Sequence, residues 1–336
     1  MNDIEAKIFG MVFGHALGDA IGAPSEFPII QEYTGKLEFS MKRAAKPVFR
    51  ISEKNLVVGQ LTDDTEMAMT LTYIIAKGYT KEKAVMEYMS WANSGNPFLG
   101  KNTSNLLKGI KTYKGYKKRY EKFANPNNQS NGPLMRAYPL VVAKEFIKDD
   151  VFITNPNELC LEIVQIYIGA IQDALNNKNK NIILENAIRK ATKSETKEVL
   201  KQVKNKKKRD VSGKSKGWIV HSFYCAFYAL HNFNSFKKGI DGVMFLDDFF
   251  NPTIRKPFNK KSRGNTDTDT NCAIAGALMG AYYGFFNMCK DPVTKKNLQI
   301  LIRANPDNGD VPRHTKYHNI NLYHISQILF NIYKSN

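Results

Sequence analysis

The pattern of hydrophobic and polar positions along the chain is mainly that of amphipathic helices. In residues 80–91 the apolar side chains recur at helical spacing behind Thr80, a residue type that favours the N-cap position. The same periodicity predicts helices over residues 102–110, 133–146, 158–175, 181–204, 218–230, 270–286 and 320–333. Strand-like alternation is scarce, although residues 56–59 are candidates for a short strand. The pattern therefore predicts an all-α fold, a compact bundle of many helices around one core.

The chain of 336 residues is predicted to form a single domain spanning residues 1–336. Its length alone would allow two domains, but the candidate motifs described below are spread over most of the chain and argue for one unit. Its 43% hydrophobic and 24% charged residues are ordinary for a globular protein. Residues 176–216 are dense in lysine, and we expect them to form a charged excursion on the surface.

The sequence gives no sign of export or of a membrane span. The longest apolar run, residues 272–286, is shorter than the roughly 18 residues that a spanning helix needs. The four cysteines form no Cys-x-x-Cys pair, so neither a disulfide framework nor a cysteine zinc site is predicted. We therefore expect a cytoplasmic protein in a reducing environment, with no membrane partner.

The chain is strongly basic, with 49 Lys and Arg against 31 Asp and Glu and a formal net charge of +18. Such a charge favours anionic partners. The excess is mostly lysine accompanied by abundant asparagine, which an AT-rich coding sequence produces without selection for binding. No aromatic residues are interleaved with the basic cluster at 201–209, and no known nucleic-acid-binding module is present. Nucleic acid is therefore a compatible partner but not a favoured one.

Two short clusters of aspartate and threonine precede apolar helical segments. They are Leu61-Thr62-Asp63-Asp64-Thr65 and Asp267-Thr268-Asp269-Thr270. Carboxylate and hydroxyl oxygens are hard ligands that suit Mg²⁺, Ca²⁺ or Mn²⁺, and no thiolate or histidine pair lies nearby to favour zinc. The two clusters therefore predict a site for a hard cation, provided that they meet in space.

Helix capping explains either cluster equally well when it is taken alone. Aspartate and threonine are favoured N-cap residues, and Asp63 followed by Glu66 resembles a capping box. A third carboxylate, Glu26, follows a glycine-containing helix end, where it either faces a cavity or is a solvated loop residue. The helix after the second cluster carries glycines at four-residue intervals, which predict close packing against a neighbouring helix: Gly276, Gly280 and Gly284.

Taken together, these motifs resemble those of the ADP-ribosylglycohydrolase family over residues 8–285. Besides the two clusters, the matching elements are Gly14-His15-Ala16-Leu17-Gly18-Asp19-Ala20-Ile21-Gly22 with Glu26, Asn131-Gly132-Pro133-Leu134-Met135-Arg136, and Gly217-Trp218. The resemblance implies a compact all-α fold whose central cleft holds two Mg²⁺ ions, with Mn²⁺ as an alternative. It also implies an enzyme that cleaves the glycosidic bond between ADP-ribose and a protein side chain or small acceptor.

The resemblance assigns roles to particular residues. It implies six metal ligands: Thr62, Asp63, Asp64, Asp267, Asp269 and Thr270. It places Glu26 as the catalytic or metal-proximal glutamate, acting as acid or base. The implied ADP-ribose-binding residues are Gly100, Asn128, Gln129, Ser130, Asn131, Asn155 and Trp218.

The chain departs from the family pattern at three places. Many members have an acidic residue two positions before the glycine that Gly100 represents, and here Phe98 stands there, so an acid that could hold a guanidinium is missing. Asn155 replaces a histidine, and Asn265-Thr266 replaces a pair of glycines. All six implied metal ligands are present, so we expect an active enzyme whose acceptor the sequence does not identify. The alternative is a non-catalytic protein on the same fold that binds ADP-ribose or nucleic acid.

Overall fold

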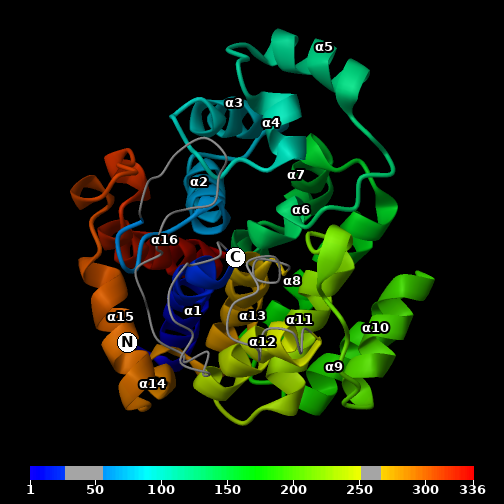
Figure 1. Ribbon diagram of the computed structural model, residues 1–336, viewed down its shortest axis with the longest axis vertical. Coiled ribbons are helices and arrows are strands. Elements are labelled where there is room, and N and C mark those ends of the chain that lie inside the picture. The colour runs from blue at the N-terminus through cyan, green and yellow to red at the C-terminus, as the bar shows by residue number, and fades with distance from the viewer. Residues whose placement is uncertain (27–55, 251–265) are drawn as a thin grey trace.

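Two helices, α1 (Asp3–Glu26) and α13 (Thr268–Tyr283), lie side by side at the centre of the molecule (Figure 1). The computed structural model describes residues 1–26, 56–250 and 266–336, with the side chains of all but residues 25, 26, 245 and 247–250. Within these ranges it contains helices and turns but no strand, and Ser130 and Trp218 form an isolated bridge. The predicted all-α class is confirmed for this part of the chain, and the possible strand at 56–59 is not formed.

The other helices surround the central pair. Figure 1 shows α2 to α7 grouped on one side of it, α8 to α12 on another and α14 to α16 on a third. They are α2 (Asp63–Ala76), α3 (Lys81–Ala92), α4 (Lys101–Leu107), α5 (Tyr113–Phe123), α6 (Gly132–Met135), α7 (Ile147–Thr154), α8 (Glu158–Leu175), α9 (Lys180–Lys190), α10 (Ser194–Lys204), α11 (Ile219–Asn232), α12 (Phe236–Phe250), α14 (Phe285–Met288), α15 (Pro292–Arg303) and α16 (Leu322–Ser335). Among the described helices, none combines the length and the apolar character needed to cross a membrane.

Glycines bring the backbones of α1 and α13 into direct contact. A Cβ atom added at Gly14 of α1 would overlap the carbonyl oxygen of Gly276, and one added at Gly276 would overlap that of Gly14. The same holds between Gly10 and Gly280. At the end of the contact, a Cβ on Gly22 would lie 2.5 Å from the Cα of Asp269. The close packing predicted from the glycines of α13 is confirmed, and it places the end of α1 against the start of α13.

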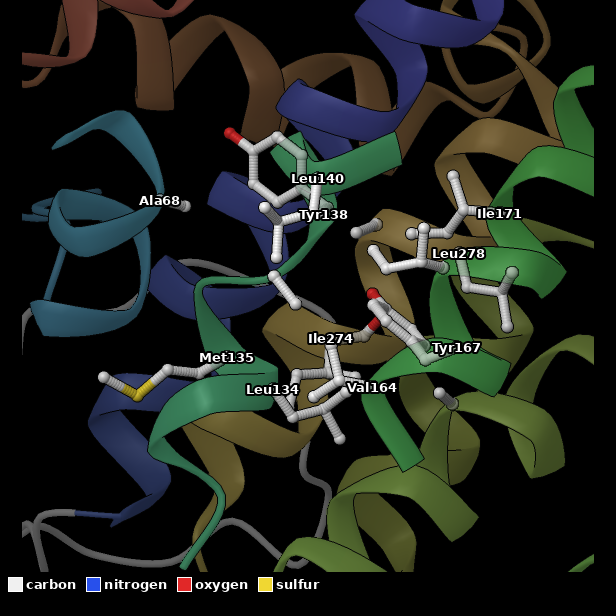
Figure 2. Close-up of a cluster of buried hydrophobic side chains, with 14 of the residues drawn as sticks. Ala68, Leu134, Met135, Tyr138, Leu140, Val164, Tyr167, Ile171, Ile274 and Leu278 are labelled. Atoms are coloured by element: carbon white, nitrogen blue, oxygen red, sulfur yellow. The ribbon is translucent and has the colours of Figure 1, made fainter. Parts of the chain in front are cut away.

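A large apolar core fixes α13 from its other side. Figure 2 shows Val164, Tyr167 and Ile171 of α8 beside Ile274 and Leu278 of α13, with the segment after α6 completing the cluster. The hydroxyl of Tyr167 donates a hydrogen bond to the carbonyl oxygen of Ile274 at 2.8 Å. This bond satisfies the one polar group that Tyr167 brings into the core.

Two of the predicted helices, in which amphipathic periodicity is accompanied by a capping residue, are confirmed. The hydroxyl of Thr80 accepts from the backbone N–H of Lys83 at the start of α3, and α8 occupies residues 158–175 as predicted. The single helix predicted over 133–146 is wrong: α6 ends at Met135, and a 3-10 helix follows around Pro139. A proline lacks the backbone N–H that a continuous α-helix would need there.

The single helix predicted over residues 181–204 is also wrong, because α9 and α10 are separate helices. The carboxylate of Glu162 on α8 accepts the backbone N–H groups of Thr192 and Lys193 at 3.0 and 3.1 Å. A partner distant in the sequence therefore stabilises the break. Helices α5, α7, α12 and α15 were not predicted.

Candidate functional site

Asp19 of α1 holds the first turn of α2. Its Oδ2 accepts the backbone N–H groups of Thr62 and Thr65 at 3.0 and 3.3 Å, and its Oδ1 accepts the Thr62 hydroxyl at 2.7 Å. Burial raises the pKa of this carboxyl to about 6, against the lowering effect of these hydrogen bonds. Because the backbone donors at a helix start have no partner within their own helix, a carboxylate from another helix can cap them. Asp19 thereby fixes α2 to the end of α1.

The two acidic clusters meet at this point. The side chains of Thr270 and Asp267, from the second cluster, lie close enough to Asp64 of α2 to influence the pKa of its carboxyl. Burial raises the pKa of Asp64 well above its ordinary value, and the negative charges of Asp63, Asp19 and Asp267 raise it further. Gly22 lies against the backbone of Asp269, so the second cluster also contacts α1. Segments 203 positions apart in the sequence, at Asp64 and Asp267, therefore share one largely buried, acidic junction.

The capping box predicted for Asp63 and Glu66 is wrong. Thr62, and not Asp63, occupies the N-cap position of α2, and it makes no side-chain cap hydrogen bond. Asp267 occupies the N-cap position of α13, also without such a bond, and its Oδ2 accepts from Nδ2 of Asn131 at 2.6 Å. The carboxylate of Glu66 binds other residues instead of turning back to the helix start. Neither N-cap residue, Thr62 or Asp267, therefore caps its own helix through its side chain.

The donor atoms at the junction suit a hard cation. Oδ1 of Asp64 is buried and has no hydrogen-bond partner, while Oδ2 accepts from the Thr62 hydroxyl at 3.2 Å. A buried carboxylate oxygen without a partner, surrounded by other carboxylates, is costly unless positive charge is supplied. Within the described residues, no group of three or more His, Cys, Asp or Glu side chains stands in a geometry that would hold a metal ion. The donors fit Mg²⁺ by type, and the ligand set stays a prediction.

A loop beside the second cluster carries four of the predicted ADP-ribose-binding residues, 128–131. Nδ2 of the fully buried Asn155 donates to Oδ1 of Asn128 and to Oγ of Ser130, both at 3.0 Å. Nε1 of Trp218 donates to Oε1 of Gln129 at 2.8 Å. The structure thus brings Asn155 and Trp218 together with this loop, which Asn131 joins to Asp267.

Two other predicted site residues, Gly100 and Glu26, lie at helix ends. Gly100 is the exposed N-cap of α4, and a Cβ there would meet no atom within 4 Å, so the chain leaves open space beside it. The first turn of α4 contacts Asn155, because Nδ2 of Asn102 donates to Oδ1 of Asn155 at 3.4 Å. Glu26 is the last residue of α1, one helical turn beyond Gly22, and its side chain lies outside the described residues.

A fully buried ion pair that the sequence did not single out supports the loop. Nε of Arg136 lies 2.9 Å from Oδ2 of Asp150, and neither side chain is exposed. Arg136 also donates to the carbonyl oxygen of Gly132 at 3.0 Å and to the hydroxyl of Thr154 at 3.2 Å. The pair therefore fixes both the end of the loop and the residue before Asn155. Arg136 ends one of the motifs that resemble the family, whereas nothing in the sequence identifies Asp150 as its partner.

The chain resembles known proteins over most of its length. The profile of the family described as ADP-ribosylglycohydrolase matches residues 1–290. ADP-ribosylarginine hydrolase Tri1 of Pseudomonas putida (strain GB-1) is 24% identical over 306 residues, which cover 85% of this chain and 73% of that protein. ADP-ribosyl-[dinitrogen reductase] glycohydrolase of Rhodospirillum rubrum is 23% identical over 311 residues, covering 88% and 92%.

The fold also matches a solved structure. A chain of an ADP-ribosylglycohydrolase-related protein complex superposes with a TM-score of 0.66 and covers 99% of each chain, at 18% sequence identity. At that identity the likeness establishes a shared fold. It extends the match beyond residue 290 to nearly the whole molecule.

Proposed function

The chain belongs to the ADP-ribosylglycohydrolase family, and we propose that it is a hydrolase that releases ADP-ribose from a protein side chain or a small acceptor. The observation that carries this proposal is the meeting of the two acidic clusters around the unpartnered oxygen of Asp64, next to the loop at 128–131. The relatives named above are, by their names, hydrolases of ADP-ribosylarginine and of ADP-ribosylated dinitrogen reductase. These names support an ADP-ribosylated protein as the substrate.

We propose Mg²⁺ as the cofactor, with Mn²⁺ as an alternative. Two ions would be held by Thr62, Asp63, Asp64, Asp267, Asp269 and Thr270. Bound there, they would neutralise the carboxylates, polarise the ribose hydroxyls and lower the pKa of a water molecule. Asp19 and the Asn131 amide would keep the donors of α2 and α13 in place, through the hydrogen bonds that they make to Thr62 and Asp267.

The reaction replaces the bond between ribose C1 and the acceptor atom by a bond between C1 and a water oxygen. One proton leaves the water and one reaches the acceptor, so an acid or base beside the bond accelerates the reaction. We assign this proton transfer to Glu26. The loop at 128–131, anchored by Asn155, would bind the diphosphate and distal ribose with amide and hydroxyl groups, and Trp218 would contact the adenosine end.

The residue at position 98 favours a substrate in which ADP-ribose is linked to a group other than arginine. Phe98 occupies the position where many family members carry an acid, and it is buried in an apolar cluster with Ala23, Leu56 and Val311. An apolar group does not offer the paired oxygens that a guanidinium binds. We therefore expect the chain to hydrolyse an uncharged linkage, such as ADP-ribosylserine, faster than ADP-ribosylarginine.

A substrate panel tests the proposed function. Peptides with ADP-ribose on serine or arginine, ADP-ribosylated nucleic acid and O-acetyl-ADP-ribose would be incubated with catalytic amounts of the protein and Mg²⁺ or Mn²⁺. We expect release of free ADP-ribose from at least one of them, detected by chromatography. ADP-ribose binding without turnover of any substrate would instead support the non-catalytic alternative.

Replacing Asn155 by leucine is expected to weaken ADP-ribose binding. The change keeps the size of the side chain but removes the donors to Asn128 and Ser130, at a cost of about 1–3 kcal/mol in unfolding free energy. Urea denaturation and calorimetric titration with ADP-ribose would measure the two effects. Asn179→Ala, which removes the N-cap of α9 and costs about 1 kcal/mol, is the control and should keep wild-type affinity. Equal affinity in the two variants would contradict the assigned role of the loop.

A further inference from the structure

The carboxylate of Glu66, on α2, is saturated by donors from three separate segments. Its Oε1 accepts from Nε of Arg313 at 2.6 Å. Its Oε2 accepts from Nη2 of Arg313 and Nε1 of Trp91, both at 2.8 Å, and from Nδ2 of Asn96 at 3.0 Å. Glu66 and Arg313 are each 1% exposed. With four donors in place, Glu66 is fully occupied as a structural anchor rather than available to a metal or a substrate.

This anchor lies close to the candidate metal ligands. Glu66 follows Asp63 by three residues, so the two are about one turn apart on the same helix. Asp19 holds the first turn of α2 from α1, and the Glu66–Arg313 pair holds it from the C-terminal part of the chain. The matched family profile ends at residue 290, before Arg313.

The same arginine reaches the segment that leads to Gly100. Arg313 donates to the carbonyl oxygen of Ser94 at 3.3 Å and to its hydroxyl at 3.1 Å. Oδ1 of Asn96, the residue that also binds Glu66, accepts the backbone N–H of Phe98 at 2.7 Å. One buried guanidinium therefore connects the start of α2, the segment 94–98 and the C-terminal part of the chain.

We propose that Arg313 is a positioning residue, which acts through Glu66 to set where Asp63 and Asp64 stand relative to α13. A two-pronged guanidinium–carboxylate pair fixes orientation as well as distance, so it can define the rotation of α2 about its axis. Arg313, which lies beyond residue 290, then contributes to the geometry of the hydrolytic site. The catalytic consequence rests on the proposed function, whereas the effect on α2 is a property of the chain itself.

The test uses two variants and a matched control. Arg313→Lys keeps the positive charge but loses the planar guanidinium, which makes two hydrogen bonds to one carboxylate. The double variant Glu66→Gln/Arg313→Met removes both charges together, so that no buried charge is left unpaired. Leu301→Ala, in the core contact of α15, destabilises the C-terminal part without touching Glu66. Melting temperature, turnover, the Mg²⁺ concentration for half-maximal turnover and amide hydrogen exchange at residues 61–69 would be measured for each protein.

Both Arg313 variants are expected to fold, to lose about 10- to 100-fold in kcat and to require more Mg²⁺ for half-maximal turnover. Exchange at residues 61–69 should become about tenfold faster, while exchange at residues 194–204 keeps its wild-type rate. Leu301→Ala should lower the melting temperature and leave kcat, the Mg²⁺ requirement and exchange at 61–69 unchanged. If Arg313 only stabilised the fold, the two Arg313 variants and Leu301→Ala would show the same kcat, Mg²⁺ requirement and exchange at residues 61–69 for the same loss in melting temperature.

Wild-type exchange at residues 61–69 in both Arg313 variants would overturn the proposal, whatever their turnover. This readout needs neither substrate nor metal. If the wild-type protein hydrolyses no ADP-ribose conjugate, the proposed function fails, and the exchange data still decide whether Arg313 positions α2.

Discussion

Replacement of Asp64 by asparagine is expected to abolish ADP-ribose release, with a loss of about 1,000-fold or more, while the protein stays folded. Asp64 is the residue of the first cluster that lies near Asp267 and Thr270 of the second, and its unpartnered oxygen would carry the charge that attracts the cation. Losing a metal ion that stabilises several kcal/mol of developing charge costs a factor of this order. Asparagine keeps the shape of the side chain and removes one of several neighbouring negative charges. Without metal, the variant should therefore melt at or above the wild-type temperature.

Thermal melting with and without Mg²⁺ separates the loss of the metal site from misfolding. The wild-type protein should gain stability with Mg²⁺, because a ligand that binds only the folded state raises the melting temperature. Asp64→Asn should lose that gain. Asp241→Asn, which removes a carboxylate paired with Lys237 on α12, is the matched control and should behave as wild type toward Mg²⁺. Wild-type turnover in Asp64→Asn would refute the role assigned to the clusters.

The second large effect is expected from Gly276→Ala. The added methyl group would overlap the carbonyl oxygen of Gly14, and neither backbone can move without separating α1 from α13. Forcing extra atoms into a packed interior typically costs 1–3 kcal/mol, and a contact between two backbones should reach about 3 kcal/mol. That is a large share of the roughly 5–15 kcal/mol by which a folded domain is stable. Activity should fall as well, because the same contact places the end of α1, whose Asp19 holds α2, against the start of α13.

Urea denaturation followed by tryptophan fluorescence would measure this loss of unfolding free energy. Gly132→Ala is the matched control, because a Cβ at that position would meet no atom within 4 Å. It should unfold within about 0.5 kcal/mol of the wild type, as most substitutions away from special features do. Equal stability of Gly276→Ala and Gly132→Ala would show that the two helices are not held as described.

The helices that could be predicted are those in which the apolar spacing and the capping residue, both local in the sequence, indicate the same helix. In α3 and α8 the apolar spacing and the cap agree with each other. The break between α9 and α10 is held by Glu162, some 30 residues earlier, and the apolar periodicity of residues 181–204 did not reveal it. The close-packed face of α13 could be predicted from its own glycines, but no feature of that helix identifies α1 as its partner. Local periodicity determines which face is buried, and the partner follows from the whole fold.

The candidate site, too, has a part that could be predicted from local sequence and a part that could not. The residue types of the two acidic clusters indicate a cation site or two caps. Only the folded chain, in which Thr62 is the N-cap of α2 and Glu66 binds Arg313, excludes the capping box of Asp63 and Glu66. What holds the clusters together was not predictable: Asp19 acts across 43 residues and Arg313 across 247. Both are buried charged groups whose partners lie far along the chain. The metal ions and the role of Glu26 stay predictions.

Anomalous diffraction from crystals of the protein grown with Mn²⁺ and ADP-ribose tests the central claim most directly. The account predicts two anomalous peaks between the starts of α2 and α13, in contact with oxygens of Asp63, Asp64, Asp267 and Asp269 and beside the bound ribose. Density for ADP-ribose without any peak at that junction, or Mn²⁺ bound only by other residues, would contradict it.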